Sequence, residues 1–324
     1  MTERFDICGI PTFLEPWITR FYTPLEIDLL TKLNKRPMTA NEVRQKRGAA
    51  SSGSFLERAW RRGVVRRLDD GRIAPADFHV RFESWALFEG WQDLPEDIKD
   101  RLNRWELDHY TARHRETVAS IKAGQPRPTE DACPEYLLLE EVTRLFERIE
   151  RFYLWPCNCR AMVRGCTLPQ LTCIRFSNAR GIGWEISRER ALSVVKEANR
   201  QGLMQSAELA VDNQGRLDGA LCNCCNDCCF PHQLARVLDA EKTWPLTRYL
   251  AELSPEPCNG CGRCERCCPL GAISQAKKKK GMPPPPPVIE ANLCRGCGVC
   301  ATGCPQEAIY MQKIRESVLE MYYT

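Results

Sequence analysis

Eight of the twenty cysteines lie in two runs with identical spacing. The first run is Cys258-x2-Cys261-x2-Cys264-x3-Cys268, and the second is Cys294-x2-Cys297-x2-Cys300-x3-Cys304. A proline follows each run, and two glycines and an Ala-Ile pair recur at the same 36-residue offset, so the runs are an internal duplication. Thiols this crowded indicate a bound metal or metal cluster. Two zinc knuckles are the alternative, which the paired Cys-Pro endings disfavour.

The spacing resembles that of the bacterial-type ferredoxin domain, which binds two [4Fe–4S] clusters. The resemblance implies that each cluster takes three cysteines from one run and one from the other. One cluster would be bound by Cys258, Cys261, Cys264 and Cys304, and the other by Cys294, Cys297, Cys300 and Cys268. Cysteines at every third position let a short loop wrap three corners of a cube, and the glycines let backbone N–H groups approach the sulfurs. We expect the fourth cysteine to begin a helix and reach across to the other cluster.

Nine further cysteines form two groups in the middle of the chain. The groups are Cys157, Cys159, Cys166 and Cys173, and Cys222, Cys224, Cys225, Cys228 and Cys229. Each contains Cys-Asn-Cys, which in an extended backbone puts both thiols on one face. Three interpretations are open: an additional iron–sulfur cluster, a zinc ion with His232 as an alternate ligand, and thiols without metal. The ferredoxin-like runs favour the additional cluster, because it would extend an electron path.

Three cysteines stand apart from these groups. Cys8 and Cys133 are isolated and are expected to be buried, inert thiols, and Cys267, beside Cys268, is expected to be a packed thiol. The opening MTERFDICGI lacks the basic-then-apolar pattern of a secretory signal, so we expect a cytoplasmic protein, where lasting disulfides are rare. No apolar run reaches the roughly 18 residues of a membrane span.

The expected fold class is α+β, in several domains. The expected domains are a winged-helix-like domain over 1–80, a helical connector over 81–134, a cysteine-rich α/β domain over 135–245 and a ferredoxin-like 2[4Fe–4S] domain over 246–324. Capping boxes at 23–26 and 39–42, a helix over 54–62 and a tight turn at 69–71 indicate three helices followed by a hairpin. That order resembles the winged helix-turn-helix fold.

The middle of the chain carries weaker signals. Residues 85–115 indicate two helices, and residues 122–128 a linker. Apolar residues at helical spacing predict an amphipathic helix over 136–152, and Ser187 is expected to cap a helix over 188–200. A turn is expected at 213–215. The cysteines of this region are expected on loops at strand ends.

These features predict an electron-transfer protein that serves a redox partner protein or enzyme complex. The whole layout resembles multi-cluster ferredoxin-type iron–sulfur proteins of anaerobes, which implies an electron carrier or an oxidoreductase subunit. Lys277 to Lys280 indicate either a docking patch for an acidic partner or a solvated turn. Dinucleotide, phosphate-loop and serine-elbow motifs are missing, and His109 and His114 are expected on a solvated helix face. Any catalysis is therefore expected at an open iron of the extra site, or in a partner subunit that this chain supplies with electrons.

A redox-responsive DNA-binding regulator is the alternative function. The net charge of +4, the hydrophobic content of 43% and the charged content of 27% are ordinary for a globular protein and do not by themselves indicate nucleic acid. The third helix and the hairpin nevertheless carry basic residues where phosphate contacts would fall. They are Arg58, Arg61, Arg62, Arg66, Arg67 and Arg72.

Overall fold

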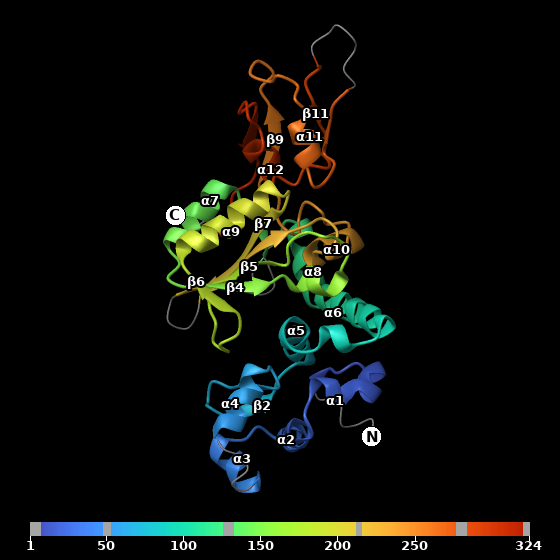
Figure 1. Ribbon diagram of the computed structural model, residues 1–324, viewed down its shortest axis with the longest axis vertical. Coiled ribbons are helices and arrows are strands. Elements are labelled where there is room, and N and C mark those ends of the chain that lie inside the picture. Colours follow the sequence, from blue (N-terminus) through green and yellow to red (C-terminus); the bar gives the residue numbers. More distant parts are fainter. Residues whose placement is uncertain (1–7, 48–52, 126–132, 212–215, 277–283, 320–324) are drawn as a thin grey trace. The chain divides into compact units, whose positions relative to one another are not determined.

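The structure is a computed structural model that describes residues 8–47, 53–125, 133–211, 216–276 and 284–319 (Figure 1). The chain divides into two compact units: Met1–Glu106 with Ala179–Ile182, and Leu107–Asn178 with Gly183–Thr324. The predicted turn at 213–215, the Lys277–Lys280 segment and the end of the predicted linker lie outside the described residues. No helix in the described part of the chain is long and apolar enough to cross a membrane.

The first unit is mainly helical and carries one hairpin. Its elements are η3 (Thr12–Trp17), α1 (Ile18–Phe21), α2 (Pro24–Lys35), α3 (Ala40–Arg47), α4 (Gly53–Arg61), β1 (Val65–Arg67), β2 (Ile73–Pro75), α5 (Phe78–Phe88), η4 (Trp91–Asp93) and the start of α6 (Glu96–Lys122). The Glu26 carboxylate accepts from Thr23 N–H at 2.8 Å and the Thr23 hydroxyl accepts from Glu26 N–H at 3.3 Å, which confirms the first capping box. Thr39 and Glu42 form the second in the same way.

The structure therefore contains the three predicted helices, α2, α3 and α4, followed by the predicted hairpin of β1 and β2. Strands β1 and β2 pair antiparallel, with Val65 opposite Pro75 and Arg67 opposite Ile73. Gly63 follows α4 with φ of +74°, and a Cβ there would lie 2.8 Å from the Val80 carbonyl oxygen, so this position requires glycine. The winged-helix identity of this arrangement stays a prediction.

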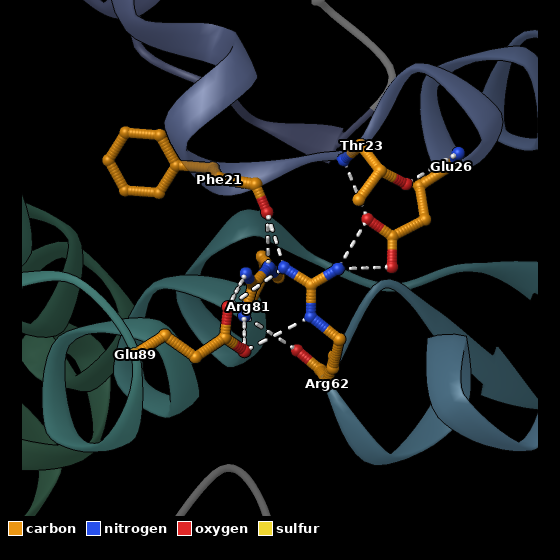
Figure 2. A network of polar contacts seen from close by, with 6 residues as sticks. All are labelled: Phe21, Thr23, Glu26, Arg62, Arg81 and Glu89. Atoms are coloured by element: carbon orange, nitrogen blue, oxygen red, sulfur yellow. Dashed lines mark hydrogen bonds and ion pairs between the residues drawn. The ribbon is translucent and has the colours of Figure 1, made fainter.

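Arg62 and Arg81 form a network of hydrogen bonds and ion pairs with Glu26 and Glu89 in the first unit (Figure 2). Arg62 Nη1 donates to both oxygens of Glu26 at 2.6 and 2.7 Å, and its Nη2 donates to Glu89 at 2.8 Å. The fully buried Arg81 also bonds Glu89 at 2.6 Å and donates to the Phe21 carbonyl at 2.8 Å. Arg62, which the sequence suggested for a phosphate contact, is thus held by two carboxylates of its own unit.

The prediction of two helices over 85–115 is wrong in its boundaries. Helix α5 ends at Phe88, and α6 runs unbroken from Glu96 to Lys122 into the predicted linker. His114 is also buried rather than on a solvated face, with its ring 5.0 Å from that of Trp244 and 4.5 Å from that of Tyr110. The alternating charges around His114 gave no sign of this contact in the sequence, because one side of a long helix can be solvated while the other side packs.

His79 and Glu106 predict a pH dependence of stability. His79 Nδ1 lies 2.7 Å from Glu106 Oε1, whose side chain is almost fully buried. Burial lowers the pKa of His79, but the hydrogen bond and charge of Glu106 outweigh it, so the folded pKa is raised above 6.5. Stabilisation by this pair is therefore complete below about pH 6.5 and is lost as pH rises through the raised pKa. The thermal midpoint of the full-length chain should fall by a few degrees between pH 6 and 8.5.

A His79→Gln variant should lose most of this pH dependence, because glutamine does not titrate. His109→Gln serves as the matched control on α6 and should keep the slope of the unmodified chain. An unchanged slope in His79→Gln would show that another group titrates.

The second unit is built on a six-stranded sheet in which every strand pair is antiparallel. Its spatial order is β3 (Glu135–Tyr136), β7 (Met204–Val211), β8 (Leu217–Cys224), β5 (Leu171–Arg175), β4 (Phe152–Pro156) and β6 (Trp184–Ile186). Helices α7 (Leu139–Glu147) and α9 (Arg188–Arg200) pack on one face of this sheet (Figure 1). Their contact buries Val142, Phe146, Val195, Ile174 and Leu221 together. The mixture of helices and strands agrees with the α+β class.

The predicted helix over 136–152 is wrong at both ends. Tyr136 belongs to β3, where it pairs with Ser206, and Phe152 starts β4. Helix α7 begins after Leu138, whose N–H donates to the Glu141 carboxylate at 2.8 Å. Pairing with β7 overrides the helical spacing at the first end, and the aromatic run Phe152–Trp155 suits a strand at the other. The helix over 188–200 is confirmed, with Ser187 accepting from Arg190 N–H.

The ferredoxin-like segment consists of two copies of a strand–loop–helix–strand unit. The first copy holds β9 (Tyr249–Leu253), α11 (Arg263–Cys267) and β10 (Ile273–Ser274), and the second holds β11 (Val288–Ile289), α12 (Val299–Thr302) and β12 (Ile309–Lys313). Strand β9 pairs with β12, and β10 pairs with β11. Leu253 opposite Ile309 and Ile289 opposite Ile273 are equivalent pairs under the 36-residue offset. The sequence duplication is thus a structural pseudo-symmetry.

Candidate metal centres

The two ferredoxin-like runs line two separate cavities. The first cavity is lined by Cys258, Cys261, Cys264 and Cys304. The second is lined by Cys294, Cys297, Cys300 and Cys268. Each cavity therefore receives three cysteines from one run and the fourth from the other, as the resemblance implies. Apolar contacts of Cys264, Cys294 and Cys300 with Ile273 and Ile309 join the cavities in one core.

Helix geometry differs from the prediction at the fourth cysteine of each run. Cys268 ends α11 rather than beginning a helix, and Cys304 follows α12 in the same way. Both thiols accept a backbone hydrogen bond at 3.3 Å, from Ala272 N–H and Ala308 N–H respectively. Donors to sulfur stabilise thiolate and shift the potential of a bound cluster, so the residues present fit [4Fe–4S] clusters.

Gly296 in the second cysteine loop should not tolerate a side chain. Its φ is +69°, and a Cβ there would lie 2.1 Å from the Tyr249 carbonyl oxygen in β9. The strained dihedral and a clash with backbone together should cost about 3 kcal/mol. Gly296→Ala should therefore lower the thermal midpoint of the anaerobic full-length protein by roughly 5–10 °C.

Gly271→Ala is the matched control, since Gly271 also has a positive φ, of +63°, but a Cβ there would meet nothing within 4 Å. It should cost only about 1 kcal/mol. Equal thermal midpoints for the two variants would mean that the backbone of β9 moves away from the new side chain at low cost.

Six of the other nine cysteines form a chain of neighbouring thiols, which we call the six-thiol set. In order of contact they are Cys157, Cys159, Cys229, Cys224, Cys222 and Cys173. Strand pairing assembles part of the set, because β8 carries Cys222 and Cys224 on the face opposite Leu221, and β5 carries Cys173. The first turns of α8 (Asn158–Val163) and α10 (Phe230–Val237) supply the others.

The expectation that these cysteines lie on loops at strand ends is wrong for part of the six-thiol set. Cys173 and Cys222 lie within strands, and Cys159 lies in α8. The extended Cys-Asn-Cys geometry holds for Cys222 and Cys224 but not for Cys157, because a helix starts at Asn158. Burying thiols inside secondary structure limits their freedom and pre-positions them for a metal.

Two members of the six-thiol set, Cys222 and Cys229, have lowered pKa values. Burial raises the pKa of Cys229, but hydrogen bonds from the Cys159 and Cys224 thiols outweigh it and hold the pKa at about 6. Hydrogen bonds from Cys173 and Cys224 likewise lower the pKa of Cys222. The donors Cys159, Cys173 and Cys224 have raised pKa values. Cys222 and Cys229 are thus the members of the set that lose their protons most readily, and thiolate is the form that binds metal.

Arg160 is the buried cation of this region. It donates to the Asn223 carbonyl at 2.8 Å and to the Pro169 carbonyl at 2.9 Å, and only 2% of it is exposed. Burial lowers the pKa of Arg160, but the charges of Cys157 and Cys225 raise it overall. The position offsets the charge of thiolates around it. Sequence reasoning missed Arg160, although an arginine directly after Cys157-Asn158-Cys159 was a signal.

The remaining three of the nine cysteines, Cys166, Cys225 and Cys228, form a separate group, which we call the three-thiol set. Their sulfurs all lie within 4.8 Å of one another. His232, the suggested alternate ligand, has its Nε2 2.8 Å from the Tyr136 hydroxyl and is thus engaged with a phenol. Cys8 and Cys133 are buried as expected, and burial raises the pKa of Cys8 to about 12. Cys267 contacts the Cys264 and Val299 carbonyls and lines neither cluster cavity.

The six-thiol set and the second cluster cavity share an apolar contact. Cys224 and Cys229 pack with Tyr136, Met204 and Cys297, the last of which lines the second cavity. Tyr136 and Met204 are almost fully buried there. Sequence reasoning placed Tyr136 on a helix and missed this role. The six-thiol set and the thiols of the second cavity thus meet in a buried apolar contact.

The comparisons with known proteins cover only the ferredoxin-like segment. Residues 257–308 match the family model of the 4Fe-4S dicluster domain. No curated protein and no solved structure matches the chain. The matched residues contain all eight cysteines that line the two cavities. Residues 257–308 are therefore a ferredoxin-type 4Fe–4S domain, and the chain has an iron–sulfur electron-transfer role.

Proposed function

We propose that this protein relays single electrons to or from a partner redox enzyme through two [4Fe–4S] clusters and a third metal centre. The observation that carries the proposal is the pair of cavities, each lined by four cysteines drawn from both runs. Cys258, Cys261, Cys264 and Cys304 would hold one cluster, and Cys294, Cys297, Cys300 and Cys268 the other. When bound, such clusters supply reversible one-electron transfer.

The third centre is an additional iron–sulfur cluster held within the six-thiol set. Four thiolates suffice for a [4Fe–4S] cluster, and the set offers six from β5, β8, α8 and α10. Arg160 would offset part of its negative charge. Tyr136 and Met204 pack in one buried cluster with Cys224 and Cys297, which excludes water there and keeps the two ligand groups close. Such closeness favours electron transfer.

The first unit is proposed to be a winged-helix module that docks a redox partner protein. DNA binding is the less favoured role, because four of its six candidate arginines are paired with carboxylates of the same unit. Arg61 and Arg67 bond Glu57, Arg62 bonds Glu26 and Glu89, and Arg72 bonds Asp70. Phosphate contacts would first have to break these pairs. A gel-shift screen should accordingly find no salt-sensitive duplex binding.

Iron and acid-labile sulfide of the anaerobically purified full-length chain test the proposal. Three clusters require about twelve iron atoms per chain, whereas two require about eight. Replacing Cys222, Cys224 and Cys229 together by alanine leaves three thiols in the set, so it should lower twelve to about eight and leave the reduced ferredoxin signals in the electron paramagnetic resonance spectrum. Eight iron atoms in the unmodified protein would eliminate the third cluster. Fewer than eight, with no reducible cluster, would eliminate the relay. Proteins that co-purify anaerobically would identify the partner.

A further inference from the structure

The three-thiol set has a different geometry from every other cysteine group in the described residues. The sulfurs of Cys166, Cys225 and Cys228 lie within 4.8 Å of one another, and those of Cys166 and Cys228 are 3.7 Å apart. Elsewhere in the described part of the chain, no three Cys, His, Asp or Glu side chains bring their ligand atoms so close. The ferredoxin quartets, all of which are described, are therefore more widely spaced.

The distances between the sulfurs distinguish a site for a single ion from a site for a cluster. Four thiolates around one tetrahedral ion at about 2.3 Å are about 3.8 Å from each other, which matches the Cys166–Cys228 separation. Thiolates of a [4Fe–4S] cluster bind different iron atoms and point outward from the corners of a cube, so they stand further apart. The three-thiol set is thus too tight for a cluster and suited to one ion.

The backbone holds the three sulfurs in place. Cys225 and Cys228 have the C-x2-C spacing common in zinc sites, and Cys228 N–H donates to the Cys225 sulfur at 3.3 Å. Arg164 ends α8 in the left-handed conformation, with φ of 56°, and turns the chain so that Cys166 meets Cys228. A Cβ at Gly165 would lie 3.2 Å from the Cys228 sulfur, so this turn approaches the site closely.

The fourth position of such an ion would be open to a cavity. The group contains three protein ligands, and Cys225 also lines a cavity of about 360 Å³. The walls of this cavity include Arg200, Arg263 and Arg266, whose positive charge favours water or a small anion as the entering ligand. Three protein ligands with a fourth, exchangeable one is the pattern of zinc sites that are open to substrate.

We propose that Cys166, Cys225 and Cys228 bind one Zn²⁺ ion, separate from the iron–sulfur clusters, with water or a small anion from the cavity as its fourth ligand. The site needs no change in oxidation state. It is also independent of the relay, because zinc does not carry electrons.

Elemental analysis of the full-length chain, purified anaerobically from cells supplied with iron and zinc, tests the site. About one zinc atom per chain is expected after dialysis against buffer without metal. Cys166→Ala should lose that zinc and keep its iron, whereas the matched control Cys133→Ala should keep both. Zinc-edge X-ray absorption of the unmodified protein should show three sulfurs at about 2.3 Å and one lighter ligand.

Each contrary result has a distinct meaning. A loss of iron with retained zinc in Cys166→Ala would place Cys166 in a cluster and overturn the proposal. Zinc absent from the unmodified protein, or coordinated by four sulfurs, would overturn it as well. Because the absorption measurement uses the unmodified chain, misfolding of a variant does not affect its outcome. Failure of the relay proposal would instead appear in the iron count.

Discussion

Cys268→Ala is expected to remove about four iron atoms per chain, while Cys267→Ala is expected to remove none. The two residues are adjacent, but only Cys268 lines the second cluster cavity, where it joins Cys294, Cys297 and Cys300. Its sulfur also accepts the Ala272 N–H bond, whereas the Cys267 thiol contacts backbone carbonyls. A cluster that loses a ligand from a sequence-distant run should be released, because three remaining thiolates leave one iron exposed.

The measurement is iron and acid-labile sulfide on both variants, with electron paramagnetic resonance of the reduced proteins. Cys268→Ala should keep the signal of one cluster, since Cys258, Cys261, Cys264 and Cys304 are untouched. Loss of iron from Cys267→Ala would show that Cys267 also binds iron, contrary to the expectation. Full iron in both variants would contradict the exchange of fourth ligands between the runs.

Arg248→Met is expected to lower the stability of the second unit by about 3–5 kcal/mol. Arg248 is 1% exposed, and its Nη2 donates to Glu141 at 2.6 Å, while its Nε lies 3.2 Å from Glu135. Both carboxylates are also buried, so removing the guanidinium would leave their charges without compensation. Glu135 belongs to β3 and Glu141 to α7, and Arg248 directly precedes β9, so the change would loosen the junction of these elements.

Thermal unfolding of the full-length protein under anaerobic conditions measures this effect. Arg151→Met is the matched control, because Arg151 bonds Glu185 at 2.8 Å with both side chains more than half exposed. An exposed pair contributes about 0.5 kcal/mol, so its midpoint should hardly move. Adding Glu141→Gln to Arg248→Met should recover part of the loss by removing one buried charge. Equal midpoints for Arg248→Met and Arg151→Met would show that water reaches the buried carboxylates.

Local patterns predict local structure well in this chain. The capping boxes of α2 and α3, the hairpin β1–β2 and helix α9 form where the sequence indicates, because their decisive contacts join residues a few positions apart. Helix–strand choices that depend on distant partners were wrong. Tyr136 has helical spacing with its neighbours, yet pairing with Ser206, seventy residues away, makes it part of a strand.

The metal centres divide in the same way. Sequence alone determined the eight cysteines of the ferredoxin-type domain, since their spacing repeats and sets which loop can surround a cluster. It could not sort the other nine, because no spacing says that Cys159 meets Cys229 or that Cys166 meets Cys228. Tertiary structure decided this: the antiparallel order β8-β5-β4, with α8 and α10 at its strand ends, brings segments about sixty residues apart together. Chain folding, rather than spacing, thus separates six thiols from three.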